Sequence, residues 1–161
     1  MAQFSDEAIQ AVVEKVRYDD PRAARYLTAT LIARRDKVVA RWLNQVNPIE
    51  NVRLDPAGLL TFDNSAVKVD AATPATRHVL RWYRFDNATG DHTQVGPAMT
   101  IPEPRAQAPA ELLAGQDHVA VTLRALHQAF REWRQPARVH FRRMPEGWQT
   151  VGIDRGYDEE E

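Results

Sequence analysis

The hydrophobic pattern of the chain changes its period at Asn47 and Pro48. Before these residues, apolar side chains recur at the spacing of one helix face. After them, apolar and polar residues alternate in short runs separated by turn residues, which is typical of antiparallel strands. The pattern therefore predicts an α+β fold that is helical over residues 5–46 and mostly β over residues 58–155.

Two helices are predicted in the N-terminal third. Ser5, followed by two acidic residues, is typical of a helix start, and we expect the first helix to run to about Arg17. Pro21 opens the second helix, because proline in the first turn loses no hydrogen bond that the helix would make. A helix of about 25 residues is only marginally stable alone, so its apolar stripe needs cover from the first helix, the sheet or a partner. The stripe comprises Ala24, Leu27, Leu31, Val38 and Trp42.

Turn residues divide the remainder into three predicted hairpins. The proline-rich segment 97–115 is expected to be a loop that crosses an edge of the sheet. Segment 118–134 fits both a strand and a helix, and we favour a strand to about Ala125 followed by a helical turn. The predicted strand pairs are 59–62 with 66–69, 78–85 with 92–95 or 99–101, and 138–143 with 148–153.

Antiparallel strands with one polar face need cover on the other face, and the two helices are the obvious candidates. The predicted architecture is an N-terminal helical hairpin or arm packed on a mostly antiparallel β-sandwich or curved sheet. A chain of 161 residues is long enough to bury about 70% of its unfolded surface in one core. We predict a single domain over residues 1–157 and a disordered acidic tail over residues 158–161.

Basic residues gather on the second predicted helix. Residues 21–46 contain six cations and one anion, Asp36, although the net charge of the chain is only -1. A basic helix face more often reflects solvation than nucleic-acid binding, which stays a minor alternative. If this helix presents an interaction face, we expect Arg34, Arg35 and Arg41 to carry it.

The composition argues against several kinds of chemistry. Without cysteine the chain has no disulfide, thiolate metal site or cysteine nucleophile. It has two serines, neither in a nucleophile-elbow motif, and no glycine-rich phosphate loop. No apolar run approaches the roughly 20 residues of a membrane span, so we expect a soluble chain. The sequence predicts no catalytic residue, no metal site and no cofactor.

The five histidines show no metal-ligand spacing. Three of them, His78, His118 and His140, lie in predicted strands. An enzyme would need a composite site in which these histidines converge with a carboxylate such as Asp86 or Asp154.

Aromatic residues suggest a possible ligand site on the sheet. Trp82 and Tyr83 alternate with arginines, and Trp148 begins the last strand. Such rings can stack on a sugar or another small molecule. Because neighbouring strand residues face opposite sides, Trp82 is expected to be separated from Tyr83, and one of the two faces is core.

Several segments at the two ends of the chain are distinctive: FSDEAI at 4–9, YDDP at 18–21, YL at 26–27, LIARRDK at 31–37 and WQTVGIDR at 148–155. In these segments the chain resembles a group of larger, uncharacterised bacterial proteins with no known activity. The resemblance implies that the chain is a C-terminal module of such a parent, in an envelope or periplasmic setting because the parents look exported.

Three functions are consistent with these features. The leading hypothesis is a non-catalytic accessory or protein-interaction module whose partner is another protein or the remainder of a larger parent chain. The first alternative is a β domain that binds a carbohydrate or another small molecule through Trp82, Tyr83 or Trp148. The second alternative is an enzyme with a composite His/Asp site.

Overall fold

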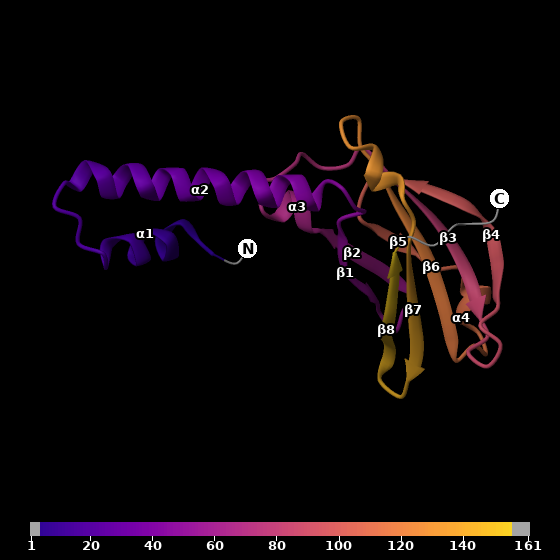
Figure 1. Cartoon of the computed structure of the whole chain (residues 1–161). Helices are drawn as coiled ribbons and strands as arrows, with labels where there is room; N and C mark the ends of the chain where they lie inside the picture. Colours follow the sequence, from indigo (N-terminus) through magenta and orange to yellow (C-terminus); the bar gives the residue numbers. More distant parts are fainter. Residues whose placement is uncertain (1–3, 156–161) are drawn as a thin grey trace.

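The computed structural model describes residues 4–155. Two helices form an arm at the N-terminus, and two open antiparallel sheets form the body (Figure 1). The predicted α+β class and the antiparallel sheets are therefore confirmed. The acidic tail predicted at 158–161 lies outside the described residues.

The arm consists of α1 (Asp6–Glu14) and α2 (Pro21–Leu43). Ser5 caps α1, since its Oγ accepts a hydrogen bond from the backbone N–H of Ala8 at 3.2 Å. Asp20 caps α2 in the same way, accepting from the N–H of Arg22 at 2.8 Å. Both helices are confirmed, although α1 ends at Glu14 rather than near residue 17, because the chain reverses there and residue 17 has a left-handed φ of 53°.

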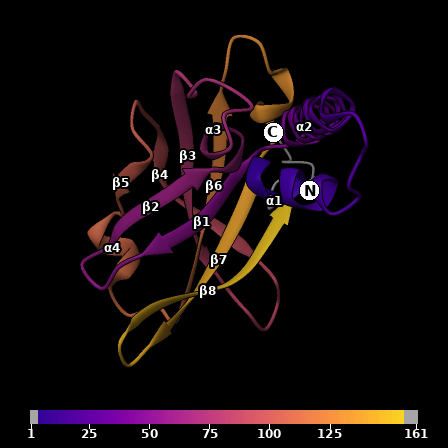
Figure 2. The same cartoon turned by 90° about the vertical axis from the view of Figure 1, so that its left-hand side faces the viewer.

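The body contains one sheet of three strands and one of five (Figure 2). The small sheet has the order β1-β2-β5 and contains β1 (Ile49–Leu54), β2 (Leu59–Asn64) and β5 (Arg105–Gln107). The large sheet has the order β4-β3-β6-β7-β8 and contains β3 (Arg77–Phe85), β4 (His92–Ile101), β6 (His118–Leu126), β7 (Ala137–Met144) and β8 (Gly147–Arg155). The body also contains three short helices: α3 (Ser65–Lys68), α4 (Ala110–Leu113) and the 3-10 helix η1 (Arg131–Arg134).

Two of the three predicted hairpins are confirmed, namely β3 with β4 and β7 with β8. Segment 118–134 is also as predicted, a strand followed by a helical turn. The first predicted hairpin is wrong. Asn64 caps α3 instead of forming a turn, because its Oδ1 accepts from the N–H groups of Ala66 and Val67. β2 instead pairs with β1 on one side and β5 on the other, and β1 lies in residues 47–57, for which no helix or strand is predicted.

The segment 97–115 is only partly a loop. Its first residues extend β4, and Arg105–Gln107 forms β5, which pairs with β2 at the edge of the small sheet. The prolines confine this pairing to three residues, because proline has no N–H to donate to a ladder.

One hydrophobic core lies between the two sheets. The small sheet contributes Leu60 and the large sheet contributes Trp82 and Phe141, and none of these side chains is more than 1% exposed. Buried Asn47 joins the end of the arm to this core. Its Nδ2 donates to the carbonyl oxygens of Leu123 at 2.9 Å and of Gln135 at 2.8 Å.

Candidate functional site

The arm projects from the body, and α1 folds back along α2 (Figures 1 and 2). Near the end of α2, Val39 is buried and the Nδ2 of Asn44 donates to the carbonyl oxygen of Ala71 at 3.2 Å. Nearer its start, α2 contacts α1. The outer part of α2, which has 23 residues, is thus covered only by α1, which has nine.

Arg35 fastens α1 to α2. Its guanidinium donates to the carbonyl oxygen of Phe4 and to the carboxylate of Asp6, both at 2.6 Å, and to its neighbour Asp36. The hydrogen bonds with Asp36 and then Asp6 raise the pKa of Arg35. The side chain is only 17% exposed. Arg35, predicted to lie on an interaction face, is therefore occupied within the arm.

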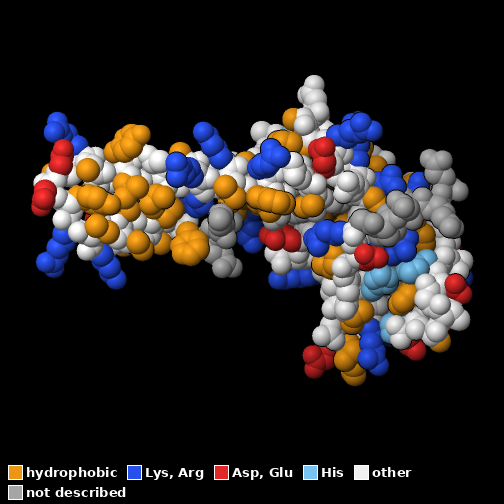
Figure 3. All heavy atoms as spheres, in the orientation of Figure 1, with side chains coloured by type: hydrophobic (Ala, Val, Ile, Leu, Met, Phe, Trp, Pro, Cys, Tyr) orange, Lys and Arg blue, Asp and Glu red, His pale blue; other side chains and the backbone are white. Residues whose placement is uncertain are grey.

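An open apolar groove runs between the two helices. It has a volume of about 390 Å³ and is walled almost entirely by hydrocarbon. Val13 is buried beneath the helix contact, but Val12 on the groove wall is 66% exposed. Figure 3 shows the hydrophobic side chains gathered along this side of the arm. We call it the arm groove; its lining residues are Phe4, Ala8, Ile9, Val12, Leu31, Arg34, Arg35 and Val38.

The apolar surface continues along α2 beyond the arm groove. Trp42 lies four residues after Val38, which places it on the same side of the helix, and it is 67% exposed. An exposed tryptophan beside an apolar groove forms a contiguous apolar patch, and such patches are typical of interaction surfaces.

Cations border this apolar surface on one side. Arg34, Lys37 and Arg41 are spaced by three and four residues, so they form one stripe beside Leu31 and Val38. All three are exposed, and none forms an ion pair with another residue of the range 4–155. We call them the basic border. Two of the three predicted interaction residues, Arg34 and Arg41, belong to the basic border. Lys37 was not among the predicted residues, although its helical spacing from Arg34 and Arg41 places it on the same stripe.

The three predicted ligand-binding rings do not form one surface. Trp82 faces the core and is 1% exposed, and Tyr83, on the opposite face of the large sheet, is also buried at 8% exposed. Trp148 is half-buried on β8, and the guanidinium of Arg143 sits over its ring at 4.5 Å from the centroid. Trp82 therefore has no ring face available for a ligand.

The outer face of the large sheet brings together histidines that lie far apart in the sequence. His92 and His140 are hydrogen-bonded through their Nε2 atoms at 2.9 Å, and the ring of Phe85 lies 4.7 Å from each. His118 meets the edge of Phe85. His78 lies elsewhere, against Phe62. The predicted histidines thus converge only in part, and His92 was missed, although the hairpin register places it opposite Phe85.

Burial dominates the electrostatics of this histidine pair. Desolvation lowers the pKa of His92, and the charge of Arg138 lowers it further. Desolvation, His92 and Arg138 lower the pKa of His140, while Asp154 opposes them. Within residues 4–155, no histidine is hydrogen-bonded to a carboxylate, which a composite His/Asp site would require.

Residues 4–155 show neither a metal-binding cluster nor a membrane-spanning helix. They contain no group of three or more histidine, aspartate and glutamate side chains placed to hold a metal ion. Nor does any helix in that range have the length and apolar composition of a membrane span.

Comparisons with family models, with curated proteins and with solved structures found no match.

Proposed function

We propose that this chain is a non-catalytic interaction module that binds an amphipathic, acidic helix of a protein partner in the arm groove. The observation that carries the proposal is the open apolar groove on a projecting arm, with a basic border beside it. The bound helix belongs to another protein or to the remainder of a larger parent chain, as the resemblance implies.

The apolar surface explains why a helix is the expected occupant. A groove between two helices accepts the apolar face of a third, with anchors spaced three or four residues apart. Each Å² of apolar surface removed from water contributes about 25 cal/mol, so covering Val12 and Trp42 stabilises the complex. Covering them also supports α2, because a long helix with little tertiary packing is marginal in water.

The basic border determines the charge of the expected partner. Arg34, Lys37 and Arg41 form no ion pair within residues 4–155, and the nearby Asp36 is bound to Arg35 instead. A helix with Glu or Asp beside its apolar face therefore meets them favourably. Such exposed charge pairs contribute more to orientation and association rate than to affinity. The interaction is therefore expected to weaken as salt is added.

The proposal is tested by titrating the chain into a fluorescently labelled amphipathic peptide of about 18 residues, which spans about 27 Å as a helix. The peptide carries leucines on one face and glutamates beside them. We expect a dissociation constant on the order of micromolar. Val12→Asp is expected to weaken binding at least about tenfold, because it places an unpaired charge in the groove.

Val151→Asp is the matched control, since Val151 is also an exposed valine, on β8 of the body. It should bind the peptide as the unchanged chain does. Equal binding by the Val12→Asp and unchanged chains, or no binding at millimolar peptide, would contradict the proposal. A concentration-dependent dimer that Val12→Asp abolishes would instead identify a second copy of the chain as the occupant.

A further inference from the structure

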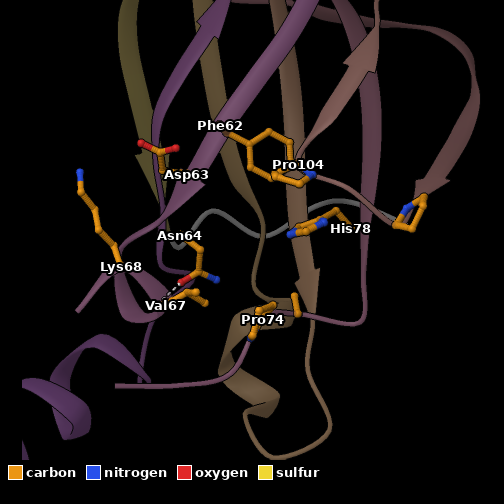
Figure 4. A pocket seen from close by; sticks show the side chains of 10 residues that line it. Phe62, Asp63, Asn64, Val67, Lys68, Pro74, His78 and Pro104 are labelled. Atoms are coloured by element: carbon orange, nitrogen blue, oxygen red, sulfur yellow. Dashed lines mark hydrogen bonds between the residues drawn. The ribbon is translucent and has the colours of Figure 1, made fainter. Parts of the chain in front are cut away.

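A second cavity, unrelated to the arm groove, lies where β2 and α3 meet the start of β3 (Figure 4). Its volume is about 500 Å³, within the range of small-molecule sites. Phe62 and prolines from two linkers form much of its wall. We call it the edge pocket; its lining residues are Phe62, Asp63, Asn64, Val67, Lys68, Pro74, Ala75, His78, Pro102 and Pro104.

Asn64 lines the edge pocket and has a buried hydrogen-bond donor beneath its wall. Its Oδ1 caps α3 by accepting from the N–H groups of Ala66 at 3.0 Å and Val67 at 3.2 Å. These two hydrogen bonds identify the oxygen end of the Asn64 amide, because only an oxygen can accept from backbone N–H groups. The Nδ2 therefore faces away from the cap; it is buried and has no hydrogen-bond partner within residues 4–155.

His78 lies opposite Asn64, and Figure 4 shows the two side chains pointing toward one another across the pocket. The residue is only 5% exposed, and its ring meets Phe62 edge-on, with centroids 5.0 Å apart. Its Nδ1 is also buried without a partner among the described residues. Burial lowers the pKa of His78, so the imidazole is neutral at pH 7.

The charged residues at the rim of the edge pocket already have partners. The Nζ of Lys68 lies 3.8 Å from a carboxylate oxygen of Glu50. The carboxylate of Asp63 accepts a hydrogen bond from the Nδ2 of Asn51 at 2.9 Å. The unpaired groups at the pocket wall are thus neutral ones, on Asn64 and His78, and they select a neutral ligand because burying a charge there is costly.

Two buried, unpaired polar atoms in one apolar pocket are unusual, because such atoms normally find a partner. We propose that the edge pocket binds a small uncharged molecule with a ring-sized apolar body and a carboxamide. The carboxamide oxygen accepts from Asn64 Nδ2, and the carboxamide also hydrogen-bonds His78 Nδ1. A carboxamide offers both a donor and an acceptor, so it suits either tautomer of His78. Both atoms are shielded from water. Binding therefore includes a small movement of the pocket lining that uncovers them while Asn64 Oδ1 stays on the α3 cap.

The test is an NMR titration of the isotope-labelled chain with benzamide, compared with benzoate, which has the same ring but a charge. We expect benzamide to shift the Asn64 side-chain NH₂ and the His78 ring resonances and to saturate in the millimolar range. Benzoate is expected to bind at least about tenfold more weakly, because its charge must be buried.

Two variants locate the binding. Asn64→Asp keeps the oxygen that caps α3 and loses the donor, and His78→Phe keeps the ring edge against Phe62 and loses Nδ1. Each is expected to weaken benzamide binding about tenfold or more. Asn87→Asp, in the exposed turn before β4, and His118→Phe are the matched controls and should leave binding unchanged.

Shifts that fail to saturate, or equal affinity in His78→Phe and the unchanged chain, would overturn the proposal. So would equal affinity for benzamide and benzoate, a comparison that needs no variant to fold. Because the edge pocket shares no lining residue with the arm groove, this outcome is independent of the peptide result.

Discussion

His92 and His140 are hydrogen-bonded at 2.9 Å although two strands separate them in the large sheet. His92 lies on β4, His140 lies on β7, and β3 and β6 run between these strands. Neighbouring strands are about 4.8 Å apart, so two side chains bridge this span only if the sheet curls toward them. In the register, Phe85 of β3 is opposite His92 and Ala120 of β6 is opposite His140.

This pair predicts that the chain loses stability in mild acid. In the folded state the pKa values of both histidines are lowered, chiefly by desolvation. The unfolded chain therefore takes up protons first, and the free energy of unfolding falls as the pH drops below about 6.5. It should be fully retained above that pH. Urea unfolding between pH 5 and 8 measures the effect.

A His92→Phe/His140→Phe variant is the companion experiment. Its free energy of unfolding should depend less steeply on pH between 5 and 6.5, with His78 supplying the remaining dependence. An unchanged slope in this variant would show that the pair does not titrate as described.

The contacts of Arg35 imply that α1 can detach from α2 without unfolding the body. Arg35→Ala removes the hydrogen bonds to Phe4 and Asp6, so α1 should detach while the body stays folded. Hydrogen exchange of the α1 amides should become severalfold faster, with no change in β6. Arg34 makes neither of these bonds, so Arg34→Ala keeps them and should exchange as the unchanged chain does. Equal protection of α1 in both variants would refute this role.

Truncating Trp133 and truncating Trp42 should change the free energy of unfolding by very different amounts. Trp133 is fully buried and stacks on Phe130 with centroids 5.2 Å apart, so Trp133→Ala should cost about 3–5 kcal/mol of stability. Trp42 is mostly exposed on the arm, and Trp42→Ala should change stability by less than about 0.5 kcal/mol. Chemical denaturation of both variants measures the difference. Similar losses would mean that Trp42 is packed in the free chain.

Replacing Asn47 should destabilise the fold more than its position just after α2 suggests. Asn47→Ala leaves the carbonyl oxygens of Leu123 and Gln135 without this donor, at a cost of about 1–3 kcal/mol. Asn87→Ala, in an exposed turn, should have almost no effect on stability. Thermal unfolding compares the two, and an equal midpoint would contradict the anchoring role of Asn47.

Local features of the fold could be predicted because they depend on neighbouring residues. The Asp20-Pro21 start of α2 and the turn before Trp148 are both set by short segments. Asn64 shows the limit of such reasoning. An Asp-Asn-Ser sequence is compatible with a hairpin turn and with a helix cap, and the choice was decided by β1, which already pairs with β2.

The candidate sites depend on contacts that no local pattern encodes. Arg35 reaches Asp6 across 29 residues, and whether it is free for a partner depends on how the arm folds back. Asn64 and His78 line the same pocket because α3 turns the chain at the edge of the small sheet. By contrast, the basic border was visible in the helical spacing of Arg34 and Arg41, because that spacing is local.

The role of the arm groove is tested most directly by reversing the charge of its border. The chain with Arg34→Glu and Arg41→Glu keeps the Arg35 contacts that hold α1. We predict that this variant binds the acidic amphipathic peptide at least about tenfold more weakly than the unchanged chain, and that it gains affinity for a peptide with lysines in place of the glutamates. Equal binding of both peptides by both chains would contradict the account.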